Sequence, residues 1–303
     1  MPTAGSAGQE LFPGFTTRSL RIEDEVQIAF ITGGSGPPLL LLHGHPETHA
    51  IWHRVAPALA EHFTLVLPDL RGYGDSSKPV GSVDHGNYAK RVMADDMLVL
   101  MGSLGFDRFD VLAHDRGARV AHRLAMDHPA AVHRLAMLDI APTLAMYEQT
   151  SEAFARAYWH WFFLIQPSPL PERLIEADPA GYVTDLMGGR SAGLTPFDPR
   201  ALVEYQRCLA LPGAAHGLCE DYRASAGIDL EHDRADRDAG RRLAMPVLVL
   251  WGRDGVIQKC FQPLDEWRRV ANDVRGEALP CGHYIPEEAP DELLAVALPF
   301  LRA

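Results

Sequence analysis

Asp115 stands at the point in the sequence where an apolar run ends and a helical pattern begins. Two small residues, Ala113 and Gly117, lie two positions before and after it, which allows the chain to turn sharply and to raise one side chain clear of the backbone. The pKa of an aspartate is about 3.9 in model peptides, so this carboxylate is ionised at neutral pH. We therefore predict that Asp115 is a nucleophile that attacks carbon and displaces a leaving group.

An ester formed on Asp115 must be hydrolysed, which requires a base to activate water and an acid to orient that base. His283 precedes the C-terminal helical pattern and is the predicted base. Two aspartates compete for the role of the acid: Asp139 ends the strand after Asp115, and Asp254 follows a later strand. Gly255 occupies the position where such an acid usually stands, so we favour Asp139 and expect Asp254 to cap a turn.

Arg116 and Arg119 place two cationic side chains one and four positions after Asp115. On a helix that begins near Arg116, both guanidinium groups can converge beside the carboxylate, so we expect a substrate that carries its own negative charge. The backbone N–H groups of His45 and Arg116 are the expected oxyanion hole. They would bind the negative charge that develops on the Asp115 carbonyl during ester hydrolysis.

These residues have two alternative interpretations. Asp115 is also a good helix N-cap, and its own segment is equally consistent with that role. His43, His45 and His49 follow an H-x-H-x3-H spacing that could ligate zinc, although no downstream ligand set accompanies them. We favour the nucleophile, and we expect neither a metal nor a cofactor.

Strand and helix patterns alternate along most of the chain. Two antiparallel strands are expected within 17–33, and buried strands at 38–42, 64–67, 111–115, 135–139, 246–252 and 276–279. Helices are expected at about 51–61, 88–102, 116–128, 263–270 and the C-terminus. This order predicts an α/β fold with a mostly parallel, doubly wound sheet and functional residues at the carboxyl ends of its strands.

The stretch from 142 to 240 lacks strand patterns and contains helical segments, such as 154–165, joined by Pro- and Gly-rich connectors. We interpret it as a helical cap inserted into the sheet domain. The predicted organisation is a core in two parts, 1–141 and 241–303, with the cap at 142–240.

Composition excludes several classes of protein. The chain has 303 residues, of which 47% are hydrophobic and 22% charged, as in ordinary globular proteins. Its formal net charge of −12 argues against a nucleic-acid partner. Residues 1–14 show no signal-peptide pattern and no later stretch holds about eighteen consecutive apolar residues, so we expect no membrane partner and a cytoplasmic location. Four scattered cysteines favour reduced thiols.

Seven segments carry a resemblance to a known family: HGHPETH at 43–49, PDLRGYGDSSKP at 68–79, AHDRGARVAHRLAMDHP at 113–129, LDIAPT at 138–143, WHWFF at 159–163, CEDYRA at 219–224 and GHYIPEEAP at 282–290. The chain resembles the fluoroacetate dehalogenases, which are haloacetate dehalogenases of the α/β-hydrolase fold. The resemblance extends over nearly the whole chain. It implies that Asp115 is the nucleophile, His283 the base and Asp139 its acid, and that Arg116 and Arg119 bind the substrate carboxylate.

The resemblance also implies a halide pocket formed by His160, Trp161 and Tyr222, which would otherwise be interpreted as core aromatics. Imidazole, indole and phenol groups are all hydrogen-bond donors, and a bond to a charged acceptor contributes about 1.5–3 kcal/mol. Donors that strengthen as charge moves onto the halogen stabilise the transition state more than the ground state. His45 departs from the aromatic residue common in the family, and Glu47 lies nearby in sequence, so pocket shape and halogen preference depend on both.

The predicted reaction is the hydrolytic dehalogenation of a 2-haloacetate, such as fluoroacetate or chloroacetate, to glycolate and halide. Asp115 would displace the halide by SN2 attack, and water activated by His283 would hydrolyse the ester. Haloalkane dehalogenases and epoxide hydrolases are alternatives, although they usually carry tryptophan after the nucleophile, where this chain has Arg116. A ligand sensor that binds without turnover is the alternative from another class. The expected partner is a small anionic haloacid, and the resemblance alone implies a homodimer.

Overall fold

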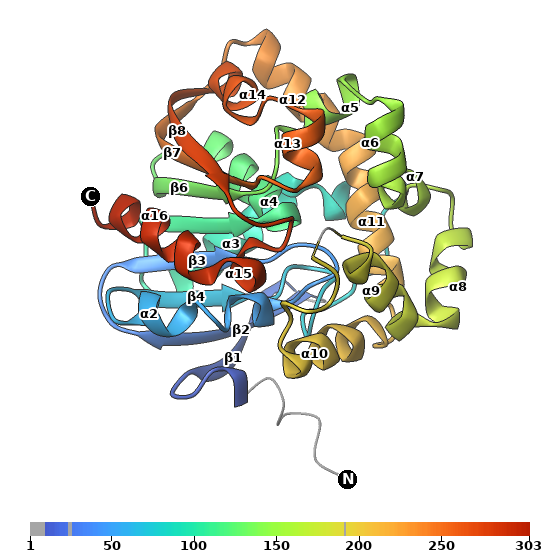
Figure 1. The fold of residues 1–303 in the computed structure, drawn as a ribbon, viewed down its shortest axis with the longest axis horizontal. Coiled ribbons are helices and arrows are strands. Elements are labelled where there is room, and N and C mark those ends of the chain that lie inside the picture. Colours follow the sequence, from blue (N-terminus) through green and yellow to red (C-terminus); the bar gives the residue numbers. More distant parts are fainter. Residues whose placement is uncertain (1–9, 24–25, 191) are drawn as a thin grey trace.

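The centre of the molecule is an eight-stranded sheet with the strand order β1-β2-β4-β3-β5-β6-β7-β8. The computed structural model describes residues 10–23, 26–190 and 192–303 (Figure 1). Residues 24–25 of the predicted strand pair and residues 1–9 of the N-terminal prediction therefore lie outside the described residues. The strands are β1 (Thr16–Glu23), β2 (Val26–Gly34), β3 (Pro38–Leu42), β4 (Thr64–Pro68), β5 (Phe109–His114), β6 (Val132–Leu138), β7 (Leu243–Gly252) and β8 (Ala271–Leu279).

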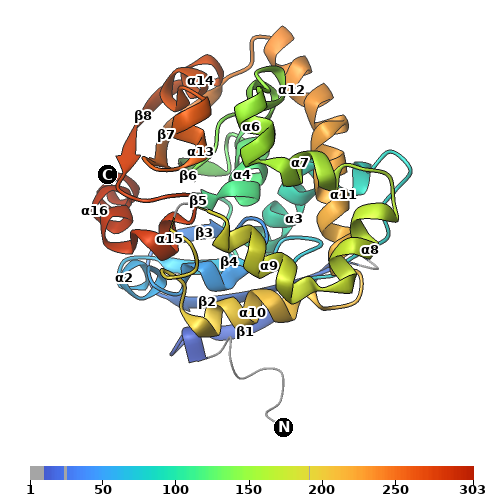
Figure 2. The same ribbon diagram turned by 45° about the vertical axis from the view of Figure 1, so that its right-hand side comes forward.

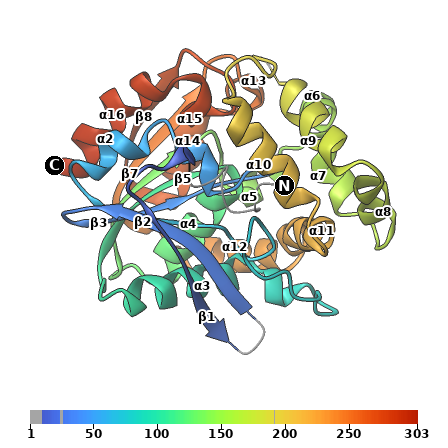
Figure 3. The same cartoon turned by 90° about the horizontal axis from the view of Figure 1, so that it is seen from below.

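The sheet is parallel except at one end. β2 pairs antiparallel with both β1 and β4, whereas the pairs from β4 through β3, β5, β6 and β7 to β8 are parallel. Every residue of β5 is buried, as expected for a parallel strand that is covered on both faces. Figure 3 shows α3 on one face of the sheet and α2 and α16 on the other. The predicted mostly parallel α/β sheet is confirmed.

The helices that flank the strands outside the cap region are mostly short. They are η1 (His49–Trp52), α2 (Ala56–Ala60), η2 (Gly86–Tyr88), α3 (Lys90–Ser103), α4 (Asp115–Asp127), α13 (Val256–Cys260), α14 (Pro263–Val270), α15 (Ile285–Glu288) and α16 (Pro290–Arg302). None of the described helices is both long and apolar enough to cross a membrane.

Between β6 and β7, the described residues form helices without strands. These cap helices are α5 (Thr143–Glu148), α6 (Glu152–Ala157), α7 (Trp159–Leu164), α8 (Leu170–Ala177), α9 (Pro179–Gly188), α10 (Pro199–Leu209), α11 (Ala214–Ala226) and α12 (Ile228–Asp238). Figure 2 shows α6 to α11 gathered along one side of the sheet. The predicted cap of 142–240 falls between the two strands.

Three predicted elements differ from the structure. The helix expected at 51–61 is a 3-10 turn followed by α2, which begins with a proline in its first turn. The helix expected at 154–165 is interrupted at Tyr158, whose φ of −111° and ψ of 39° are not helical. The last strand begins at Ala271 rather than near 276, because β8 is the edge strand and its polar residues alternate outward into solvent.

Candidate active site

The turn between β5 and α4 raises Asp115 above the end of the sheet. Asp115 has a φ of 44°, in the left-handed region that non-glycine residues rarely adopt, and such a conformation costs on the order of 1–3 kcal/mol. Gly117 lets α4 approach β3, because a Cβ atom there would lie 2.3 Å from the carbonyl oxygen of His43. Local strain and close packing thus hold one carboxylate at the carboxyl edge of the sheet.

His283 lies between two carboxylates. Its Nδ1 is 2.6 Å from Asp139 Oδ2, and its Nε2 is 3.9 Å from Asp115 Oδ2. Because a carboxylate only accepts, Nδ1 donates to Asp139 and leaves Nε2 as the basic nitrogen on the side of Asp115. Asp139 also has a positive φ, 50°, and its Oδ1 accepts from the Gly252 N–H at 2.9 Å. The structure therefore brings Asp115, His283 and Asp139 together.

Asp254, the competing acid, points elsewhere. Its side chain is exposed, and its backbone N–H donates to the carbonyl of Cys281. The acid that contacts the imidazole is Asp139.

The loop after β3 supplies a backbone donor to Asp115. The His45 N–H donates to Asp115 Oδ1 at 3.0 Å, as the predicted oxyanion hole requires. The Gly44 N–H donates to Glu47 Oε2 at 2.9 Å, which fixes the same loop from within. The second predicted donor is the backbone N–H of Arg116, and its role in the oxyanion hole stays a prediction.

The two arginines that follow Asp115 differ in their pairing. Arg116 contacts the carboxylate of Asp221 through Nε at 2.8 Å and Nη2 at 3.0 Å. Arg119 donates through Nη1 to Thr143 Oγ1 at 2.8 Å, and the contacts described for it include no carboxylate ion pair. Within the described part of the chain, Arg116 Nη1 and Arg119 Nε are buried without a hydrogen-bond partner. Both groups are therefore available to an anionic ligand.

His160 and Trp161 on α7 and Tyr222 on α11 converge on the same site. The Tyr222 ring lies 6.0 Å from that of His160 and 6.3 Å from that of Trp161, between centroids. Arg116 Cζ lies 4.0 Å from the Tyr222 ring centroid, and Arg119 Cζ lies 4.7 Å from that of Trp161. Among described residues, His160 Nδ1, Trp161 Nε1 and Tyr222 OH are buried without a partner. Leaving such a group unpaired costs about 1–3 kcal/mol, so three together indicate a ligand-binding role.

The charges around Asp115 keep its carboxylate ionised. Burial would raise its pKa, but His283, His114, Arg119 and Arg116 outweigh burial and hold the pKa far below its ordinary value. The site therefore contains a buried carboxylate anion that needs no base to deprotonate it.

Sequence reasoning missed three side chains at this site: His114, Asp221 and Arg190. His114 is fully buried, with Nδ1 3.1 Å from Glu47 Oε2 and Nε2 2.8 Å from the carbonyl of His283. Burial would lower the pKa of His114, but the Glu47 carboxylate raises it to about 9. The position of His114 directly before Asp115 was the available signal. Asp221 and Arg190 approach from distant cap segments, and no local feature of the sequence indicates that they reach the site.

The histidines of the zinc alternative have separate partners. His49 Nδ1 lies 2.8 Å from Asp69 Oδ1, His43 Nε2 accepts from the Leu70 N–H, and His45 Nε2 lies 3.2 Å from Tyr182 OH. These rings do not converge on one ligand position.

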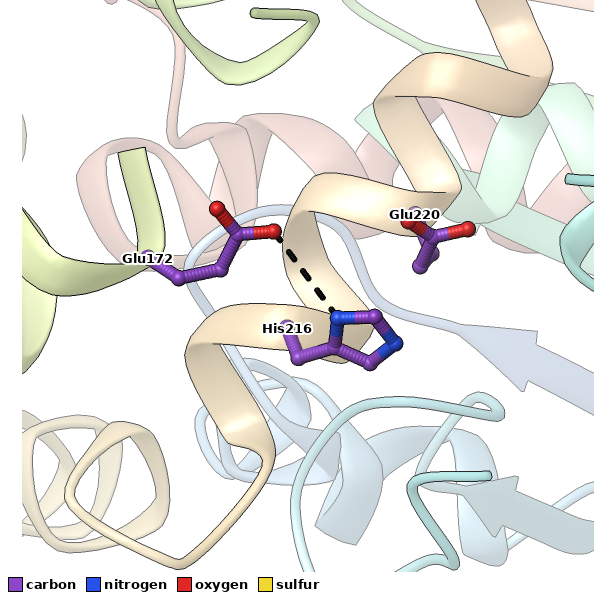
Figure 4. A group of neighbouring side chains, drawn as sticks. All are labelled: Glu172, His216 and Glu220. Atoms are coloured by element: carbon purple, nitrogen blue, oxygen red, sulfur yellow. Dashed lines mark ion pairs between the residues drawn. The ribbon is translucent and has the colours of Figure 1, made fainter. Parts of the chain in front are cut away.

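A different group has metal-like spacing: Glu172, His216 and Glu220, whose ligand atoms lie within 4.8 Å of one another (Figure 4). Arg223 Nη1 lies 2.6 Å from Glu172 Oε1 and 2.8 Å from Glu220 Oε1, so a guanidinium already neutralises both carboxylates. His216 Nε2 accepts from the Gly81 N–H, which leaves the proton on the nitrogen that faces Glu172. This set suits an arginine better than a metal ion.

Comparisons with known proteins agree with this architecture. A model of the alpha/beta hydrolase fold family matches residues 37–290. The chain belongs to the alpha/beta hydrolase fold family. This hydrolase is 47% identical over 292 residues to a fluoroacetate dehalogenase from Burkholderia sp, across 96% of this chain and 95% of the relative. It is 36% identical over 278 residues to a soluble epoxide hydrolase from Corynebacterium sp. (strain C12), across 89% and 92%.

Solved structures support the same fold. The crystal structure of ALR0039 from Nostoc sp PCC 7120 matches this hydrolase with a TM-score of 0.92 and 51% identity, over 95% of this chain and 98% of that one. The resemblance to a fluoroacetate dehalogenase and the α/β-hydrolase fold, both predicted from the sequence, are thus confirmed. Relatives named for two different reactions support an enzyme and leave its substrate to be inferred from the site.

Proposed function

We propose that this hydrolase is a haloacetate dehalogenase that forms and then hydrolyses an ester on Asp115. The observation that carries the proposal is the combination of an ionised, buried Asp115 with unpaired guanidinium N–H groups on Arg116 and Arg119. A small substrate with its own carboxylate satisfies those donors and presents its second carbon to the nucleophile. A neutral substrate would leave them unpaired, at a cost of about 1–3 kcal/mol for each group.

In the first step, Asp115 Oδ2 attacks the carbon that bears the halogen. A carbon–oxygen bond forms while the carbon–halogen bond breaks, and the halide departs with the bonding electron pair. His160, Trp161 and Tyr222 donate hydrogen bonds to the halide, and these bonds strengthen as its charge grows. The product of this step is a carboxymethyl ester on Asp115, in which the oxygen of the future glycolate is Asp115 Oδ2.

In the second step, water hydrolyses the ester. His283 Nε2 takes a proton from water, whose oxygen attacks the Asp115 carbonyl carbon, while Asp139 holds the imidazole in the required tautomer. The His45 N–H, 3.0 Å from Asp115 Oδ1, donates to the oxyanion. Collapse of this intermediate breaks the bond between the Asp115 carbonyl carbon and Oδ2, and the leaving glycolate oxygen takes the proton from His283. The new Asp115 carboxyl group then loses its proton to solvent, which restores the carboxylate.

Labelling tests the ester route directly. A single turnover of chloroacetate in 18O-labelled water should place the label in Asp115, as peptide mass spectrometry detects, because water attacks the aspartyl carbonyl. Label that appears only in glycolate would contradict the ester. Asp115→Asn should lose halide release by about 10⁴-fold or more, in line with the loss of other catalytic nucleophiles. A sensor that only binds would release no halide even in the wild type.

Epoxide hydrolysis is the second candidate, because the chain has a relative of that name at 36% identity and because Tyr158 and Tyr222 have unpaired buried hydroxyls among described residues. Those hydroxyls could donate to an epoxide oxygen. The unpaired guanidinium groups favour the anionic substrate. A panel of fluoroacetate, chloroacetate and neutral styrene oxide separates the two, because a dehalogenase releases halide and leaves the epoxide closed.

A further inference from the structure

A third arginine reaches the site from the cap. Arg190 follows α9, and its Cζ lies 4.5 Å from the centroid of the Tyr158 ring. The same Tyr158 ring lies 5.2 Å from the His160 ring and 6.2 Å from the His283 ring, between centroids. Arg190 is therefore next to the aromatic cluster that faces Asp115, on the side that contains His160.

The described residues satisfy the guanidinium of Arg190 only in part, with Tyr284 as a polar neighbour. Its Nε and Nη1 atoms are buried without a hydrogen-bond partner among the described residues. Other cap arginines have carboxylate partners: Arg223 pairs with Glu172 and Glu220, and Arg207 pairs with Glu204. Stacking on Tyr158 contributes about 0.5–2 kcal/mol, but it does not replace hydrogen bonds to the two nitrogens. A buried cation in this state is suited to an anion that comes from outside the chain.

The charge of Arg190 acts on the predicted halide pocket. Burial and then the positive charge of Arg190 lower the pKa of His160 well below its ordinary value, so the imidazole is neutral. Arg116 and Arg119 come from the core helix α4 and lie against Tyr222 and Trp161, whereas Arg190 comes from the cap and lies beside Tyr158. Each predicted donor to the halide thus has an arginine nearby. Arg116 lies near Tyr222, and Arg119 lies near Trp161. Arg190 acts on His160.

We propose that Arg190 binds the departing halide together with His160 and thereby determines how readily the enzyme cleaves a carbon–fluorine bond. The inference rests on the proposed dehalogenation. A full positive charge stabilises a growing negative charge more than neutral donors do, and the effect is largest for the poorest leaving group. Arg190 is therefore a specificity-determining residue for the halogen rather than an additional ligand of the substrate carboxylate.

Bromide binding tests the proposal without turnover. Arg190→Gln should raise the dissociation constant of bromide, measured by tryptophan fluorescence, at least tenfold, and Arg190→Lys should raise it less. The matched control is Arg156→Gln, which removes an exposed cap arginine paired with Glu152 and accounts for collisional quenching. Circular dichroism and thermal unfolding establish that each variant is folded.

Kinetics provide the second readout. Arg190→Gln should lower kcat for fluoroacetate at least tenfold more than kcat for bromoacetate, with a smaller change in KM. An equal rise in KM for both substrates, with unchanged bromide affinity, would overturn the proposal, and so would wild-type behaviour in both assays. If the wild type releases no halide from any haloacetate, the proposed function fails instead. If the wild type turns over but bromide affinity is the same in Arg190→Gln, only this inference fails.

Discussion

Helix α4 contains buried arginines in two opposite states of pairing. Arg119 and Arg123 lie one turn apart and are equally buried, at 3% exposure each. Arg123 contacts Asp236 at 2.6 Å, Asp233 at 2.7 Å and Asp127 at 3.3 Å, so carboxylates of α4 and α12 neutralise it. Arg119 has a hydroxyl and a thioether as neighbours and an unpaired Nε among the described residues.

We interpret the difference as that between a structural cation, Arg123, and a cation proposed to bind a ligand, Arg119. Paired buried charges hold α4 against the cap, and removal of one partner is costly because the others remain buried. An unpaired buried cation reduces stability and persists where a ligand uses it. Arg119 and Arg123 share residue type and burial, so neither property distinguishes them. Incomplete hydrogen bonding does, and it points to Arg119 as the arginine of the candidate site.

His283→Gln should give the largest effect on activity and little effect on stability. Without the base, the first step proceeds and the ester accumulates, so we expect one halide per enzyme followed by arrest, with turnover reduced by about 10⁴-fold. Intact-protein mass spectrometry should detect one added carboxymethyl group on Asp115. Steady turnover at the wild-type rate would remove His283 from the hydrolytic step.

Exchange of each α4 arginine for methionine tests the comparison itself. Arg123→Met should lower the free energy of unfolding by about 3–5 kcal/mol, because it leaves buried carboxylates unpaired, and should leave KM unchanged. Arg119→Met should lower kcat/KM for chloroacetate roughly 10- to 150-fold and cost little stability. Urea unfolding and steady-state kinetics measure the two effects. If both variants lost only stability, or both lost only activity, the difference in pairing would not distinguish a structural arginine from a ligand-binding one.

Tyr222→Phe removes one unpaired donor and nothing from the packed core. Loss of its hydroxyl should slow defluorination about tenfold and debromination less, because fluoride is the poorer leaving group and depends more on hydrogen bonds. Competition between fluoroacetate and bromoacetate measures the ratio. Equal slowing of both reactions would assign Tyr222 to packing.

The smallest expected effect concerns pH and stability. The pKa of His114 is raised from an ordinary 6.5 to about 9, so the folded state binds more protons than the unfolded state between these values. Its contribution to stability is complete below pH 6.5 and disappears as pH rises through 9. Glu287, whose pKa burial raises to about 8, adds a decline of the same sign. His114→Gln should therefore flatten the fall in melting temperature across this window, and a parallel curve would contradict the assignment.

Sequence predicted the elements of the site that depend on strand ends. Asp115, Asp139 and His283 each follow a strand directly or at a short distance, and the carboxyl ends of neighbouring parallel strands meet at one edge. Arg190 and Asp221 could not be predicted, because their positions depend on how the cap helices pack. The break at Tyr158, which separates α6 from α7, also depends on tertiary packing. His160, Trp161 and Tyr222 came from family resemblance alone, since helical aromatics usually belong to a core.

The left-handed backbone conformation at position 115 restricts which residue types can occupy it. Asparagine tolerates this conformation nearly as well as aspartate, whereas branched and bulky side chains do not. Asparagine also preserves the shape of the side chain while abolishing its charge. Under the proposed dehalogenation, one nucleotide exchange in the Asp115 codon would therefore convert the enzyme into a receptor for small haloacids, with its fold and pocket unaltered.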